Sequence, residues 1–237
     1  MTLQDLQFSP ERWAAFWRAF KAEPQQLAGI EELRQHIAQS DGALLTESAS
    51  WAQNFRKTPP KPAGVVTPDL MHRLTGYRAA AFDQHFCDDC NRLFADTGFD
   101  KHPQAMQMLM ANMMHETANF IYLKELASGV AYNNRSDLGN GPSDGPKYKG
   151  VGVLQLTGRH NYQRLADALG DQSVMDGVDY VADKYPFTSA RTWILDNHLL
   201  DVCLNQGFEA ACVRVNGGHN GYADRCAKYE ICKREME

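Results

Sequence analysis

The chain contains 237 residues, of which 43% are hydrophobic and 22% are charged. This composition is ordinary for a globular protein and excludes disordered and fibrous classes. The length suits one large domain, or one domain with a small appendage. The net charge of −5 argues against a general electrostatic grip on nucleic acid, so no nucleic-acid partner is expected.

Neither a membrane-spanning segment nor a signal peptide is predicted. No stretch reaches the roughly 18 consecutive apolar residues that a spanning helix needs, because Gln107 and Asn112 interrupt the most apolar run. The first residues lack both the basic and the apolar region of a signal peptide. We therefore expect no membrane partner. We also expect the protein to stay in the cytoplasm until another component releases it.

The six cysteines are expected to be reduced thiols, because nothing in the sequence directs the chain to an oxidising compartment. Cys87 and Cys90 have the spacing of half a zinc site. A structural zinc site usually needs a second close pair, and the next cysteine is more than a hundred residues away. We therefore predict no metal site, and we expect Cys203 and Cys212 to be small core residues.

Residues 1–57 are predicted to form a helical N-terminal region. Ser9-Pro10-Glu11 combines an N-cap with a proline at the first helical position. Aromatic residues then recur at helical spacing, at Trp13, Phe16, Trp17 and Phe20. This face either packs in a core or binds a partner. The proline-rich segment 58–65 breaks the periodicity and is predicted to link this region to a domain at residues 66–237.

The pattern of residues 66–237 is mostly helical. Thr67-Pro68-Asp69 has the form of a helix start, and Pro103 begins another helix that runs towards His115. Six glycines and two prolines in residues 129–152 predict a long shaped loop. Long ordered loops in compact domains are usually functional.

Two glutamates are candidates for acid–base chemistry. Glu116 closes a methionine-rich run, and a carboxyl group held against apolar neighbours can stay protonated and act as an acid. The alternative is an ordinary surface residue at a helix end. Glu125 follows nine residues later, so the two would lie on opposite faces of an unbroken helix. A bend at residues 117–120 would bring both to one substrate, an arrangement that suits glycosidic hydrolysis.

Polar residues follow the glycine-rich loop, where a short strand-like run leads into a new helix. Gln155 and Thr157 alternate with apolar residues, so both could point into one cleft. Four basic residues and no acidic one lie between Lys147 and Arg164. This local excess suits an anionic polymer, although a solvated surface accounts for it equally well.

These motifs occur in an order that resembles glycoside hydrolase family 19. The most similar pattern is that of bacteriophage endolysins and related bacterial lysozyme-type enzymes. The likeness covers residues 66–235 and is carried by His115-Glu116-Thr117, Glu125, Tyr132-Asn133-Asn134-Arg135, Gly139-Asn140, Asp144-Gly145, Lys147-Tyr148-Lys149-Gly150, Gln155-Leu156-Thr157-Gly158-Arg159, Asn161-Tyr162, Val215-Asn216-Gly217-Gly218 and Asn220-Gly221.

The resemblance implies a mainly α, lysozyme-like domain with a small β element, preceded here by the short helical N-terminal region. It also implies an inverting hydrolase of β-1,4 glycosidic bonds. Glu116 matches the general acid of the family and Glu125 its second carboxylate, the base that positions water. Thr157 is a candidate to help hold that water.

The same resemblance implies a set of substrate-binding residues. Those that match residues lining the sugar cleft are Gln155, Thr157, Asn161 and Asn216. The loop motif beside the cleft is matched by Tyr132, Asn133 and Arg135, and Arg225 matches the arginine before the last helix. Two positions depart from the pattern: Val151 replaces an arginine of the glycine-rich signature, and Asn119 stands where a glycine often occurs.

The leading interpretation is a peptidoglycan hydrolase of the muramidase-type endolysin class. A chitinase of the same family is the alternative, and a non-catalytic wall-binding virion protein is a third. The expected partners are peptidoglycan glycan strands or chitin oligomers. No cofactor and no metal are expected, and the protein is expected to be a monomer. Residues 1–57 would bind the cell wall or a partner, or pack on the catalytic domain. A holin-like pore or injection would carry the protein from the host cytoplasm to the periplasm and cell wall.

Overall fold

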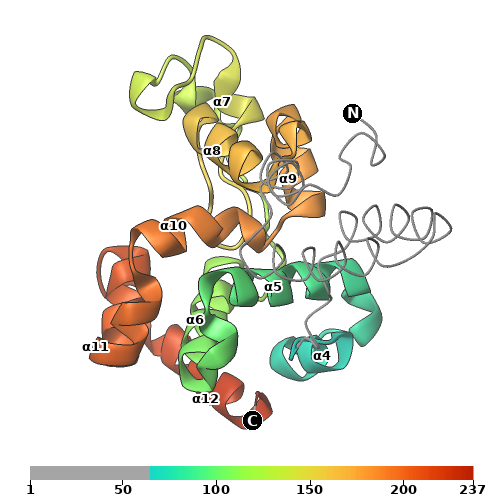
Figure 1. The fold of residues 1–237 in the computed structure, drawn as a ribbon, viewed down its shortest axis with the longest axis vertical. Helices are drawn as coiled ribbons and strands as arrows, with labels where there is room; N and C mark the ends of the chain where they lie inside the picture. The colour runs from blue at the N-terminus through green and yellow to red at the C-terminus, as the bar shows by residue number, and fades with distance from the viewer. Residues whose placement is uncertain (1–64, 237) are drawn as a thin grey trace, which may run out of the picture. The chain divides into compact units, whose positions relative to one another are not determined.

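The computed structural model describes residues 65–236. The predicted helical region 1–57 and all of the predicted linker 58–65 except Val65 lie outside the described residues. The helices of the described part are α4 (Pro68–Thr75), α5 (Gln84–Thr97), α6 (Pro103–Glu116), α7 (Asp144–Lys147), α8 (Arg159–Leu169), α9 (Val178–Lys184), α10 (Arg191–Asp196), α11 (Leu199–Asn216) and α12 (Tyr222–Glu235) (Figure 1). Short 3-10 helices lie at Ala79–Ala81, Phe99–Lys101, Val130–Tyr132, Ser136–Leu138, Gln172–Asp176 and Thr188–Ala190.

The predicted fold class is confirmed, because the described residues are mainly helical with a small β element. That element consists of two isolated antiparallel bridges, which pair Val151 with Lys124 and with Leu156. The predicted strand-like run is therefore no more than a pair of bridged turns. None of the helices that the structure describes is long and apolar enough to cross a membrane.

The predicted helix starts at Pro68 and Pro103 are confirmed. Thr67 caps α4, since its Oγ1 accepts a hydrogen bond from the backbone N–H of Leu70 at 3.1 Å. Proline occupies the first turn of both α4 and α6, where the missing N–H costs nothing.

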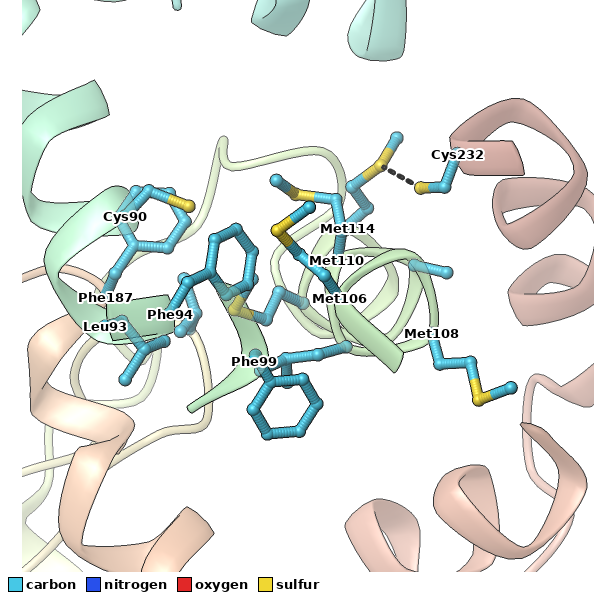
Figure 2. Close-up of a cluster of buried hydrophobic side chains, with 14 of the residues drawn as sticks. Cys90, Leu93, Phe94, Phe99, Met106, Met108, Met110, Met114, Phe187 and Cys232 are labelled. Atoms are coloured by element: carbon cyan, nitrogen blue, oxygen red, sulfur yellow. Dashed lines mark hydrogen bonds between the residues drawn. The ribbon is translucent and has the colours of Figure 1, made fainter. Parts of the chain in front are cut away.

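Helix α6 is the centre of the larger hydrophobic core. Met110 and Met113 are fully buried and Met114 is 1% exposed. In Figure 2 Met110 and Met114 lie between Phe94 and Phe99 on one side and Cys232 of α12 on the other. The Sγ of Cys232 lies 3.8 Å from the Sδ of Met114. A helix that is apolar on every side has to be enclosed by others, which explains its central place.

A second, smaller core lies among α8, α9 and the loop before α8. Its buried side chains are Tyr148, Val151, Tyr162, Leu165, Ala166, Val174 and Val181. Helices α7, α8 and α9 gather at one end of the ribbon, and α4, α6 and α12 lie at the other (Figure 1). The glycine-rich loop predicted at residues 129–152 lies between Glu116 and α8 in the chain and includes α7.

All six cysteines lie within residues 65–236. All six cysteines are free, and five of them are buried. Cys203 and Cys212 are core residues as predicted, with 4% and 1% of their surface exposed. In residues 65–236 no group of three or more His, Cys, Asp or Glu side chains is arranged to hold a metal ion.

The chain turns sharply after α6, which confirms the predicted bend. Ala118, Asn119 and Phe120 all adopt positive φ angles, of 48°, 60° and 69°. Thr117 fixes this turn: its hydroxyl donates to the carbonyl of Met113 at 2.7 Å and accepts from the backbone N–H of Phe120 at 2.9 Å. The left-handed conformation costs most L-residues about 1–2 kcal/mol each, so the turn is held by its surroundings.

Replacing Ala118 by glycine tests this strain. Ala118 is exposed, so the change removes steric conflict without opening a cavity. We expect Ala118→Gly to raise the free energy of unfolding by about 1 kcal/mol, measured by urea denaturation. As a control, Ala168→Gly in the exposed part of α8 should lower it by about 0.5–1 kcal/mol. A loss of stability at both positions would contradict the conformation described for the turn.

Candidate active site

Glu116 is the last residue of α6, and its carboxylate contacts a buried arginine of α12. The side chain of Arg225 is 1% exposed, and its guanidinium forms a short ion pair with Oε1 of Glu116. The same guanidinium donates to Oδ1 of Asn112 at 2.7 Å. The side chain of Glu116 is 26% exposed. The carboxyl group of Glu116 is therefore held by Arg225 on its buried side, and it is partly open to solvent on the other.

The surroundings of Glu116 differ from the apolar ones expected from the sequence. The methionines that precede it in the chain turn into the core, where Met113 and Met114 are buried. Its carboxylate instead meets the cation of Arg225. Sequence neighbours on a helix point in different directions, so the residues that surround a side chain come from other elements.

His115 fixes the end of α6 against the start of α12. Its Nδ1 lies 2.6 Å from Oδ2 of Asp224, and Lys228 pairs with the same carboxylate at 3.3 Å. Gly221, with φ of +70°, packs so closely on the imidazole that a Cβ atom there would overlap the ring. This contact sets the distance between the two helices that carry Glu116 and Arg225.

Glu125 lies after the turn and is held by the glycine-rich loop. Its Oε1 accepts a hydrogen bond from the hydroxyl of Tyr132 at 3.0 Å, and its Oε2 accepts from the backbone N–H of Gly150 at 2.9 Å. The backbone N–H of Glu125 in turn donates to the Gly150 carbonyl at 2.8 Å. The hydrogen bond to Glu125 raises the pKa of the Tyr132 hydroxyl, so this group stays a donor.

Because Gly150 has no side chain, the side chains of Gln155 and Glu125 can both lie close to its backbone. A Cβ atom at residue 150 would lie 2.5 Å from Oε1 of Gln155 and 3.1 Å from Oε2 of Glu125. A residue larger than glycine at position 150 would therefore displace one or both of these side chains. Gln155 itself has φ of +53°, and its amide donates to the Gly152 carbonyl at 3.1 Å.

Asn133 and Arg135 lie beside Tyr132 but do not contact Glu125. Oδ1 of Asn133 accepts from the backbone N–H of Gly145 at 2.9 Å, which braces the loop. Arg135 is half exposed and binds Asp137 through two hydrogen bonds of 2.7 Å and 2.5 Å. Among the three predicted loop residues, the structure thus brings Tyr132 to the second carboxylate.

Gln155, Thr157 and Asn161 line one pocket of about 220 Å³. The hydroxyl of Thr157 donates to the Gln155 carbonyl at 2.8 Å, and the amide of Asn161 donates to the Thr157 carbonyl at 2.8 Å. These bonds fix the shape of the segment that joins the small β element to α8. The three polar residues predicted to share a cleft are therefore neighbours.

Asn216 lies elsewhere, at the last position of α11. Its Nδ2 is buried and finds no acceptor among residues 65–236. The chain then passes through Gly217 to Gly221, which contacts His115. Asn216 is therefore close in the chain to the segment that packs on His115, and it is not one of the residues that line the pocket beside Thr157.

Several residues of the site were not predicted from the sequence. Asn112 was noted only as an interruption of an apolar run, yet a polar residue in such a helix usually has a buried partner, here Arg225. Gly150 and Gly221 appeared only as members of motifs in the family resemblance. Their role, which is to leave room for side chains distant in the chain, has no signal in the local sequence.

Comparisons with known proteins find partial similarities. No family model matches the sequence. A glycosyl hydrolase family 19 domain-containing protein of Haemophilus influenzae is 33% identical over 108 residues, which cover 44% of this chain and 51% of that protein. The acidic endochitinase SP2 of Beta vulgaris is 28% identical over 121 residues, covering 50% of this chain and 42% of that one.

A solved structure has the same fold. A bacterial family 19 chitinase superposes with a TM-score of 0.58 and 19% identity, over 73% of this chain and 95% of that one. In sequence and in fold, the chain is similar to members of glycoside hydrolase family 19. It spans about half the length of the curated family 19 relatives it matches.

The contact between Gly221 and His115 gives a test of the site that needs no substrate. Gly221→Ala should lower the free energy of unfolding by about 2–4 kcal/mol, because a Cβ there both strains the backbone and displaces the imidazole. Gly217→Ala is the matched control: its φ is +74° but nothing lies within 4 Å of its Cβ position, so only about 1–2 kcal/mol should be lost. Equal losses in denaturant unfolding would contradict the close contact.

Proposed function

We propose that this protein is an inverting β-1,4 glycosidase that cleaves the glycan strands of bacterial peptidoglycan. The observation that carries the proposal is that two carboxylates have different partners. Glu116 forms an ion pair with Arg225, whereas Glu125 accepts hydrogen bonds from Tyr132 and Gly150. Glycoside hydrolysis of this kind uses one carboxyl group as acid and another as base.

Glu116 acts as the general acid in this mechanism. It protonates the oxygen of the leaving sugar, and the bond from that oxygen to the anomeric carbon breaks. The proton transfer leaves a negative charge on Glu116. The guanidinium of Arg225 stabilises that charge at the moment it forms, because it is already in contact and needs no reorganisation. Arg225 thereby acts through Glu116 and is a positioning residue.

Glu125 acts as the base. Two hydrogen-bond donors, from Tyr132 and Gly150, orient its carboxylate. It takes a proton from a water molecule, which attacks the anomeric carbon from the face opposite the leaving group and inverts its configuration. The polar groups of Gln155 and Thr157 lie on the neighbouring segment and are suited to hold the water and the sugar.

The charge near this segment supports peptidoglycan as the substrate. Lys147 contacts the Tyr148 ring, and Lys149 donates to the Ala127 carbonyl at 2.9 Å. Neither contact neutralises the ammonium charge of these two lysines, whereas Arg159 and Arg164 of the same segment pair with Asp144 and Asp196. Lys147 and Lys149 therefore supply the positive charge near this segment. Muramic acid residues of peptidoglycan carry an acidic peptide branch that such a surface attracts.

Chitin is the second candidate substrate. The relative in Beta vulgaris is named an endochitinase, and the solved structure is described as a chitinase. Chitin and peptidoglycan share N-acetylglucosamine and the β-1,4 linkage, so the two carboxylates serve both equally. The branch on muramic acid is the chemical difference that separates them.

Product analysis tests the proposal directly. Purified peptidoglycan and chitin oligomers should be incubated with the full-length protein in parallel, and the released fragments analysed by mass spectrometry. Fragments with muramic acid at the reducing end are expected. Reducing ends on glucosamine would identify a glucosaminidase, and cleavage of chitin alone would replace peptidoglycan by chitin.

The two carboxylates are tested by isosteric variants. Glu116→Gln and Glu125→Gln should each lower kcat by about 10²–10⁴-fold, because each removes a general acid or base. Glu230→Gln, which removes an exposed carboxylate paired with Lys233, is the control and should leave kcat unchanged. Turnover by Glu116→Gln close to the unmodified rate would remove Glu116 as the acid, and the same result for Glu125→Gln would reassign the base.

Tyr132→Phe tests the orientation of Glu125. Losing a hydrogen bond to a charged group costs about 1.5–3 kcal/mol, so kcat should fall by about 10- to 100-fold with little change in KM. Tyr180→Phe is the matched control, since Tyr180 also donates to a carboxylate, that of Asp171, at 2.8 Å. If both variants lose kcat to the same extent, the contact between Tyr132 and Glu125 has no catalytic role.

A further inference from the structure

The pocket that contains Gln155, Thr157 and Asn161 extends beyond the residues assigned to the sugar cleft. Its other wall comes from α10 and the turn before it, and includes Ser189, Ala190, Thr192 and Trp193. Its volume of about 220 Å³ is several times the roughly 30 Å³ that one water molecule takes up. The pocket therefore has room for a branched substituent as well as for solvent.

An ion pair at this pocket joins α8 to α10. Nη2 of Arg164 donates to Oδ2 of Asp196 at 2.8 Å, and both residues line the pocket. Their side chains are 43% and 50% exposed. An ion pair this exposed contributes at most about 1 kcal/mol to stability, so Arg164 can exchange its partner for a ligand at little cost.

The wall opposite Gln155 is rigid. Asp89 of α5 accepts hydrogen bonds from the backbone N–H groups of Phe187 and Thr188, at 2.7 Å and 3.0 Å. Ser189 donates to the Pro186 carbonyl at 3.1 Å and packs against Gly152. The turn that carries Ser189 and Ala190 is thus fixed on both sides. A fixed wall favours a preformed site for one shape of ligand.

We propose that this pocket binds the lactyl-peptide branch of a muramic acid residue, with Arg164 as the partner of its acidic group. The proposal rests on the proposed function, because only a sugar bound beside Gln155 presents its branch here. Trp193 and Ala190 offer apolar surface to the methyl group of the lactyl ether. Arg164 then exchanges Asp196 for a carboxylate of the branch.

This assignment makes Arg164 a specificity-determining residue. Chitin has a hydroxyl group where muramic acid has its branch, so Arg164 has nothing to bind on a chitin oligomer. Its removal should therefore affect one substrate and not the other. A residue that only supports the fold would affect both substrates alike.

Rate measurements on two substrates test the proposal. Arg164→Gln in the full-length protein should lower kcat/KM on purified peptidoglycan by about tenfold or more, and change it less than twofold on chitin oligomers. Asp196→Asn, which frees Arg164, should keep or raise the rate on peptidoglycan. Arg73→Gln is the control: Arg73 is also half exposed and paired with a carboxylate, that of Glu235, but it does not line the pocket.

A binding measurement avoids any dependence on turnover. In the Glu116→Gln background, titration with a disaccharide muropeptide should change the fluorescence of Trp193, and the change should be absent in Trp193→Phe. The Kd should rise about tenfold when Arg164→Gln is added. A Kd that Arg164→Gln leaves unchanged would overturn the proposal.

The failure of this inference differs from failure of the proposed function. If the unmodified protein releases no fragments from peptidoglycan, the proposed function fails and this inference fails with it. If the unmodified protein cleaves peptidoglycan but Arg164→Gln lowers kcat/KM equally on both substrates, or on neither, only the assignment of the branch pocket is overturned.

Discussion

Burial of one guanidinium constrains the site around Glu116. Arg225 is 1% exposed, and a charge removed from water must be met by protein groups. Asn112 and Glu116, both on α6, supply them. The ion pair fixes where the carboxyl group points, and it requires α12 to lie along α6. The packing of His115 on Gly221 and its contact with Asp224 hold the two helices at that separation.

The second carboxylate depends on the turn that follows α6. Three successive left-handed residues from Ala118 to Phe120 take the chain off the helix axis. Glu125 can then bond to the glycine-rich loop through Tyr132 and Gly150 instead of continuing a helix. The fold thus gives two carboxyl groups close in sequence two different environments. The acid and base roles proposed for Glu116 and Glu125 rest on this difference.

Much of the fold follows from local rules. The starts of α4 and α6, the bend at residues 117–120, the glycine-rich loop and the mainly helical class are all confirmed. The helix starts and the loop depend on proline, N-cap and glycine positions, and the bend depends on Thr117 and Asn119, which weaken a helix. The effects of such residues reach only a few positions along the chain. The strand-like run before α8 proved to be two isolated bridges at Val151, because the run folds back on itself through Gly152 and Gln155, which have positive φ, and pairs Val151 with Leu156.

The sequence by itself determined the helical class, the bend and the two glutamates, together with the resemblance on which their roles rest. It did not determine what surrounds each carboxylate. The methionines beside Glu116 in the chain turn into the core, and Arg225, 109 residues away, takes their place. Only the tertiary structure decided this, because burial and charge pairing join residues that are distant along the chain. The pocket between α8 and α10, with Arg164 and Asp196, exists for the same reason.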